Sequence, residues 1–112
     1  MALNEPIKLM ASGSIKKIDV SDFTEIKSGA GSTVSIPISD STTYVCYYIF
    51  MFGAYLAENK GFLSCLVARK ISTGWQCSST DTSISVSATD SAITITFPYA
   101  YTTANYVIKV SH

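Results

Sequence analysis

Hydrophobic and polar residues alternate along much of the chain with the two-residue period of a β-strand. Apolar residues take every second position over residues 33–38, and the same pattern returns over residues 83–87 and 93–97. Because successive side chains of a strand point to opposite faces, each stretch predicts a strand with one apolar and one hydroxyl-bearing face. Pro37 lacks a backbone donor, which places the first of these strands at a sheet edge or beside a bulge.

Residues 44–52, Tyr-Val-Cys-Tyr-Tyr-Ile-Phe-Met-Phe, form the most apolar stretch of the sequence. Both alternating sets of side chains are apolar here, so we expect a central strand that is covered on both faces. Gly53 is expected to interrupt or end that strand. Residues 62–70 then predict a second, largely apolar strand that returns beside it.

The remaining segments complete an all-β pattern. We expect a turn or a single helical turn at residues 20–27, a short strand at 75–79, a loop at 98–105 and a closing strand at 106–110. Strands that recur every 8 to 12 residues between polar turns predict an antiparallel β-sandwich, jelly-roll or Ig-like, of about eight strands. Residues 15–112 would form this single domain, and residues 1–14 an N-terminal arm or edge strand. The pattern leaves the strand order open.

Charge and hydropathy argue against two classes of binding partner, nucleic acids and membranes. Eight basic and eight acidic residues give a formal net charge of zero, which provides no long-range field for nucleic acid or an anionic membrane. The apolar run at residues 44–57 is shorter than the roughly 20 residues that a membrane-spanning helix needs. The first residues lack a basic segment followed by an apolar one, so we expect no secretion signal. Neither nucleic-acid binding nor membrane insertion is therefore expected.

Three cysteines cannot form a complete set of disulfides. If residues 52 and 62 frame a hairpin, Cys46 lies opposite residue 68 and out of reach of Cys65. We expect reduced, buried thiols. Whether Cys65 and Cys77 approach each other across the next hairpin stays open.

The sequence offers little for catalysis or metal binding. Its single histidine, His112, is the last residue, a poor position for an oriented general base. Asp19 and Asp22 have no third ligand at calcium-loop spacing, and the widely spaced cysteines do not make a zinc site. We therefore expect no enzyme, no metal site and no cofactor.

Aromatic residues carry the only binding signal. Tyr99 and Tyr101 fall in the predicted loop, while Tyr55 and Trp75 lie near strand ends. Exposed aromatic faces stack on sugar rings or anchor protein interfaces, so these four residues are candidate ligand contacts. The alternative is that Trp75 caps the core and Tyr99 folds back over an open end of the sandwich.

The order of turns and strands resembles small β-sandwich modules of tailed-phage virions, found in tail, baseplate, fibre or capsid-decoration proteins. The resemblance covers residues 18–110 and rests on TYVCYYIFMFGAY, FLSCLVARK, TSISVSATDSAITITF and ANYVIKV. It transfers no functional residue. It implies a protein that is made in the host cytoplasm and resides in the virion, which suits a hydroxyl-rich, charge-poor composition and unpaired cysteines.

The resemblance leads to two functional hypotheses. The first is a noncatalytic structural component of a phage or prophage virion that contacts other virion proteins and itself as a homo-oligomer. Three apolar residues of the N-terminal arm, Ile7, Leu9 and Met10, are its candidate interface residues. The alternative is a carbohydrate-binding, host-adsorption module that recognises a cell-surface glycan through the exposed aromatic residues.

Overall fold

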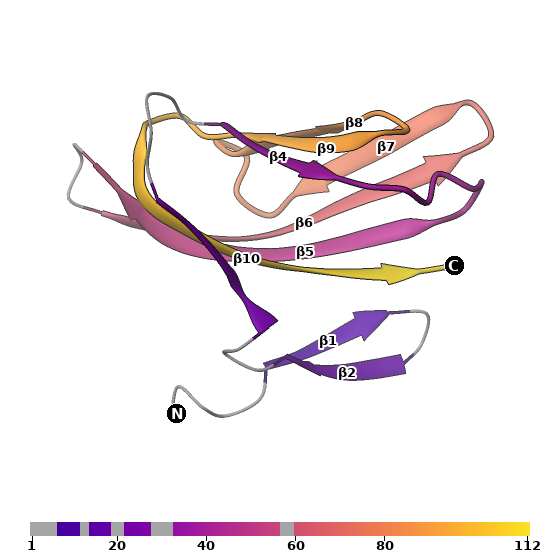
Figure 1. The fold of residues 1–112 in the computed structure, drawn as a ribbon, viewed down its shortest axis with the longest axis horizontal. Helices are drawn as coiled ribbons and strands as arrows, with labels where there is room; N and C mark the ends of the chain where they lie inside the picture. The colour runs from indigo at the N-terminus through magenta and orange to yellow at the C-terminus, as the bar shows by residue number, and fades with distance from the viewer. Residues whose placement is uncertain (1–6, 12–13, 19–21, 28–32, 57–59) are drawn as a thin grey trace.

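The computed structural model describes residues 7–11, 14–18, 22–27, 33–56 and 60–112. Eight strands form two antiparallel sheets that pack face to face, which confirms the predicted all-β sandwich (Figure 1). Within the described residues there is no α-helix, and none of the chain described could cross a membrane as a helix.

The larger sheet has five strands, and the apolar stretch predicted to be central does lie at its centre. Its strand order is β3-β10-β5-β6-β7. In that order the strands are β3 (Thr24–Lys27), β10 (Tyr101–Ser111), β5 (Cys46–Tyr55), β6 (Gly61–Ile71) and β7 (Gly74–Ser79).

The smaller sheet has the order β4-β9-β8 and covers one face of the larger sheet (Figure 1). Its strands are β4 (Thr33–Pro37), β9 (Ala92–Thr96) and β8 (Ser85–Ala88). As predicted, Pro37 lies on an edge strand, and β8 and β9 form a hairpin.

The core lies between the two sheets and consists of the inward-facing set of each strand. Val34 pairs with Ile95 and Ile36 with Ile93 on the smaller sheet, and all four side chains are buried. From the larger sheet the main contributors are Tyr47, Ile49, Met51, Phe62, Leu66 and Ala104. Burying one large apolar side chain contributes roughly 1.5–3 kcal/mol, so this layer is the main source of stability.

Gly53 does not end the central strand, contrary to the expectation from sequence. β5 continues through Gly53 to Tyr55. A Cβ atom at Gly53 would lie 2.2 Å from the carbonyl oxygen of Thr103 and 2.6 Å from Cζ of Phe62. The glycine is therefore needed for close packing of β10 and of an aromatic ring, and it is not a strand terminator.

Two segments predicted as turn and loop are partly strands. Residues 24–27 form β3, which pairs with β10, so the expected helical turn at residues 20–27 is wrong for this part. The loop predicted at residues 98–105 ends at Ala100, because β10 begins at Tyr101. Neither segment shows a clear alternation of apolar and polar residues, and both become strands by pairing with a neighbouring strand.

The three cysteines are unpaired, as expected, but the expectation that they are buried is wrong: Cys46 and Cys77 are half-buried and Cys65 is exposed. Cys46 pairs with Arg69 on β6, close to the predicted position, and Cys65 is exposed on the same face. Cys77 lies opposite Ala68 on the inward face and packs against the core. Cys65 and Cys77 thus point to opposite sides of the larger sheet and do not meet.

The outer face of the larger sheet, which points away from the smaller sheet, is only partly covered. The expectation that residues 44–52 are covered on both faces is therefore wrong, because the outward side chains of β5 are at most half-buried and Phe52 is 40% exposed. Phe23 packs edge-on against Phe50 and Phe52, with ring centroids 6.1 and 5.2 Å apart. Val107 also points to this face and is buried.

A separate hairpin lies outside both sheets. It consists of β1 (Ile7–Ala11) and β2 (Ser14–Ile18), which pair Ile7 with Ile18 and Leu9 with Lys16. Figure 1 shows the hairpin on the outer side of the larger sheet, where β1 lies near β10. The residues predicted as an N-terminal arm thus include a strand that pairs only with β2 among the described strands.

Candidate functional site

Two of the four candidate aromatic residues meet at one end of the sandwich. Tyr55 is the last residue of β5, and Tyr99 precedes β10. Their ring centroids lie 5.4 Å apart at an interplanar angle of 80°. Tyr99 is 42% exposed and Tyr55 only 7%, so Tyr99 presents a free surface above a ring that belongs to the core.

The other two candidates are not part of the cleft surface, although Tyr101 pairs with Tyr55 on the neighbouring strand. Tyr101 is 4% exposed, packs edge-on against Phe97 and donates a 3.0 Å hydrogen bond to the carbonyl oxygen of Thr33. Trp75 is half-buried against the core near Tyr47. Neither side chain shares the surface formed by Tyr99, so the candidate ligand site contains Tyr55 and Tyr99 alone from the four.

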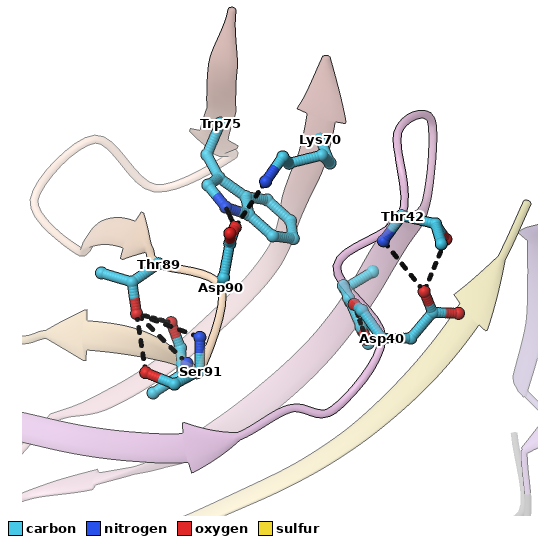
Figure 2. A network of polar contacts seen from close by, with 9 residues as sticks. Asp40, Thr42, Lys70, Trp75, Thr89, Asp90 and Ser91 are labelled. Atoms are coloured by element: carbon cyan, nitrogen blue, oxygen red, sulfur yellow. Dashed lines mark hydrogen bonds and ion pairs between the residues drawn. The ribbon is translucent and has the colours of Figure 1, made fainter. Parts of the chain in front are cut away.

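Trp75 instead takes part in a polar connection between the sheets. Figure 2 shows that the carboxylate of Asp90, in the β8–β9 turn, accepts hydrogen bonds from Trp75 and Lys70. The ammonium of Lys70 also lies 5.4 Å from the centroid of the indole ring. These two bonds lower the pKa of Asp90, the Lys70 bond being the larger cause.

A cleft of about 310 Å³ surrounds the Tyr55–Tyr99 pair. Its wall combines the two aromatic rings with an ammonium, a carboxylate and a hydroxyl. The residues that provide these groups are Tyr55, Tyr99, Lys60, Asp81 and Ser83, and Pro98 completes the rim. A volume near 300 Å³ is at the lower end of the range for small-molecule sites.

The turn after β7 fixes the carboxylate of the cleft. Oδ1 of Asp81 accepts hydrogen bonds from the backbone N–H and the hydroxyl of Ser83, at 3.0 and 2.6 Å. The carbonyl oxygen of Asp81 accepts from Ser79 and from the backbone N–H of Ile84. The two Ser83 bonds lower the pKa of Asp81, so it is ionised at neutral pH.

The hydroxyl of Tyr55 is buried and has no hydrogen-bond partner in the structure. Burial raises the pKa of Tyr55, and the negative charge of Asp81 is the second cause. The hydroxyl therefore lies within the electrostatic reach of the carboxylate but does not bond to it. A buried hydroxyl without a partner costs about 1–3 kcal/mol, so this group is poised for an acceptor that the chain itself does not supply.

The outer face of the larger sheet carries a second feature, which we name the outer apolar strip. It consists of three cross-strand pairs of β5 and β6, Phe52–Leu63, Phe50–Cys65 and Tyr48–Val67. Leu63 is 62% exposed. Exposed polar residues of β7, Gln76 and Ser78, lie along one side of the strip.

A hollow of about 470 Å³ lies at one end of this strip and is lined in part by Tyr44, Tyr48, Val67 and Arg69. Tyr44 is 62% exposed and has a φ of 75°. Positive φ is unusual for a bulky residue, because its Cβ atom crowds the following carbonyl group. The strain occurs where the chain turns into β5, and the Tyr44 N–H bonds to the carbonyl oxygen of Lys70.

His112 pairs with the carboxylate of Asp40. Bonds from Thr42 and from His112 lower the pKa of Asp40 to about 2, the hydroxyl of Thr42 being the largest cause. Among the residues that the structure describes, no three His, Cys, Asp or Glu side chains gather around a point that could hold a metal ion.

Comparison with known proteins gives no relative. No protein-family model matches the chain, and the searches of curated proteins and of solved structures give no match either.

Sequence reasoning found the aromatic half of the cleft but missed its polar half. Tyr55 and Tyr99 were recognisable as aromatics next to predicted strand ends. Asp81 and Lys60 stand in ordinary polar turns, and only the pairing of β5, β6 and β7 brings these turns to the same end of the sandwich.

Proposed function

We propose that this chain is a noncatalytic structural module of a phage or prophage virion, which assembles with copies of itself and with other virion proteins. The observation that supports assembly is the outer apolar strip, where Phe52, Leu63 and Cys65 are exposed side by side on two paired strands. The virion setting rests on the resemblance of residues 18–110 to virion sandwich modules.

The strip has the composition of a protein interface. Its centre is apolar and aromatic, and polar residues border it: Gln76 and Ser78 on β7, Asn105 and Lys109 on β10. Interfaces typically combine an apolar, water-excluding centre with a polar rim. Monomeric proteins seldom leave a contiguous apolar patch open, so this surface favours burial against a partner.

We infer that the first partner is a second copy of the chain. The outer face is already covered beside β10, where Val107 is 4% exposed, and the strip continues from this covered side towards β6. The β1–β2 hairpin lies on the same side of the sheet and pairs with no other described strand. A lone two-stranded hairpin is only marginally stable, so the strip of a neighbouring copy offers it a packing surface.

Charge does not oppose this self-association. The formal net charge is zero, so two copies do not repel each other at long range. A twofold arrangement would place the hairpin of each copy on the strip of the other, which is the self-complementary geometry of most homodimers.

Light scattering over a wide range of protein concentration tests this proposal. We expect a discrete oligomer that dissociates on Leu63→Glu, because the new charge would have to be buried in the interface. Ser87→Glu is the matched control, since it places the same charge on an exposed residue of β8 in the other sheet. A wild-type monomer at all concentrations, or an oligomer equally sensitive to both changes, would contradict the proposal.

A further inference from the structure

We propose that the cleft between Tyr55, Tyr99 and Asp81 is a binding site for a neutral saccharide ring. The proposal is independent of self-association, because the cleft lies at the end of β5 and does not include the residues of the outer apolar strip. Three groups of the cleft support it: a buried hydroxyl without a hydrogen-bond partner, a carboxylate with one unbonded oxygen, and an exposed aromatic ring.

The hydroxyl of Tyr55 is the group that points most directly to a ligand. Only 7% of the residue is exposed, and its hydroxyl oxygen has no hydrogen-bond partner. Buried polar groups are nearly always hydrogen-bonded in folded proteins. The ring of Tyr55 lines the cleft, and the exposed Tyr99 packs against it, so a small displacement of Tyr99 on binding would let a ligand oxygen accept the missing hydrogen bond.

The carboxylate of Asp81 requires a ligand group that donates a hydrogen bond. Its Oδ1 is used by Ser83, whereas the structure gives Oδ2 no bond among the described residues. A carboxylate oxygen accepts hydrogen bonds and cannot donate them. A ligand hydroxyl meets both requirements at once, because it can accept from Tyr55 and donate to Asp81.

Tyr99 supplies the third feature, an exposed aromatic face that crosses the Tyr55 ring nearly at right angles. A pyranose ring has an apolar face of C–H groups and a rim of hydroxyls, so it can pack on an aromatic surface while its hydroxyls reach polar groups. Lys60, also on the wall of the cleft, is a further donor for a sugar oxygen. The opposite charges of Lys60 and Asp81 favour a neutral ring over an anion or a cation.

The experiment is an NMR titration of the full-length, ¹⁵N-labelled protein with four probes, the methyl glycosides of glucose, galactose, mannose and N-acetylglucosamine. Glycerol serves as a polyol without a ring. We expect saturable shifts of the amides of Gly61, Asp81, Ser83 and Tyr99 with at least one glycoside and none with glycerol. No saturable shift with any of the four, or equal shifts with glycerol, would overturn the proposal.

Tyr55→Phe is the decisive variant, because it removes only the orphaned oxygen. We expect affinity to fall about tenfold, the equivalent of one hydrogen bond, while Tm stays the same or rises. Tyr99→Ala should also weaken binding, whereas Tyr44→Ala, a change at the distant exposed tyrosine, should not. Unchanged affinity in Tyr55→Phe would contradict the proposed contact. Glucuronic acid is titrated as an acidic comparison, and saturable shifts with it but with none of the four glycosides would overturn the neutral ligand.

Discussion

The indole Nε1 of Trp75 lies 3.0 Å from Oδ1 of Asp90, and this hydrogen bond joins β7 of the larger sheet to the β8–β9 turn of the smaller one (Figure 2). Lys70 donates to the same oxygen. Asp90→Ala removes the hydrogen-bond acceptor of a half-buried indole, so it should lower Tm. We expect a decrease of only a few degrees, because the Asp90 carboxylate is exposed to solvent. Thermal unfolding followed by circular dichroism measures this.

The same variant makes a pH-dependent prediction. The pKa of Asp90 is lowered in the folded protein, so the ionised form stabilises the fold above the unfolded value of 3.8. That contribution is lost as the pH falls through the lower, folded value. Asp90→Ala should therefore lose less stability than the wild type between about pH 5 and pH 2. Parallel urea midpoints against pH would contradict the role given to Asp90.

Gly53 is predicted to tolerate no side chain. Gly53→Ala would place Cβ 2.2 Å from the carbonyl oxygen of Thr103, which forces β5 and β10 apart. We expect a loss of about 2 kcal/mol or more in the free energy of unfolding, measured by urea titration. Gly61→Ala is the matched control, with its nearest contact at 3.0 Å, and it should cost clearly less. Equal losses would show that the close approach at Gly53 is not special.

The sequence predicted secondary structure best where the alternation of apolar and polar residues within one segment is enough to identify a strand. The alternation at residues 33–38 and 93–97 marks strands whose inward and outward faces differ, and both form as expected. The prediction failed where pairing with a second strand determines the structure of a segment. Tyr101 becomes a buried strand residue only because β10 extends to pair with β5, and no local signal marks that extension.

The sequence also could not predict which face of an all-apolar strand points to the core. Residues 44–52 are apolar on both sides, yet only the set that includes Ile49 and Met51 faces the smaller sheet. Cys65, on the neighbouring strand, is exposed for the same reason. In the candidate site, strand pairing brings Asp81 to Tyr55 from a turn 26 positions away, which a single sequence does not reveal.

Replacing Tyr44 is expected to raise the stability of the fold and to weaken self-association. Its φ of 75° suits glycine better than tyrosine, and its ring borders the hollow at the end of the outer apolar strip. Tyr44→Gly should raise the free energy of unfolding by up to about 1 kcal/mol, since it relieves left-handed strain. The same change should weaken self-association. A variant that is destabilised, or that assembles as well as the wild type, would contradict this assignment.

Removal of residues 1–18 should separate assembly from folding. This deletion takes away both strands of the β1–β2 hairpin, which belong to neither sheet of the sandwich. The remaining chain should keep its β-sheet circular dichroism and cooperative unfolding, but its mass by light scattering should fall to that of a monomer. An oligomer that survives the deletion would show that the hairpin, including Ile7, Leu9 and Met10, does not contribute to the interface.

Cys65 provides the most direct test that the outer apolar strip is buried between copies. Its thiol is exposed in the monomer beside Phe50, whereas Cys77 faces the core and serves as an internal reference. The measurement is the rate of alkylation by iodoacetamide at each cysteine, followed by peptide mass spectrometry at increasing protein concentration and fixed pH. Desolvation raises the pKa of both thiols, so the pH is held fixed and each cysteine is compared with itself across protein concentrations. We predict that Cys65 becomes protected as concentration rises while Cys77 does not change; a Cys65 rate that is the same at every concentration would contradict assembly through this face.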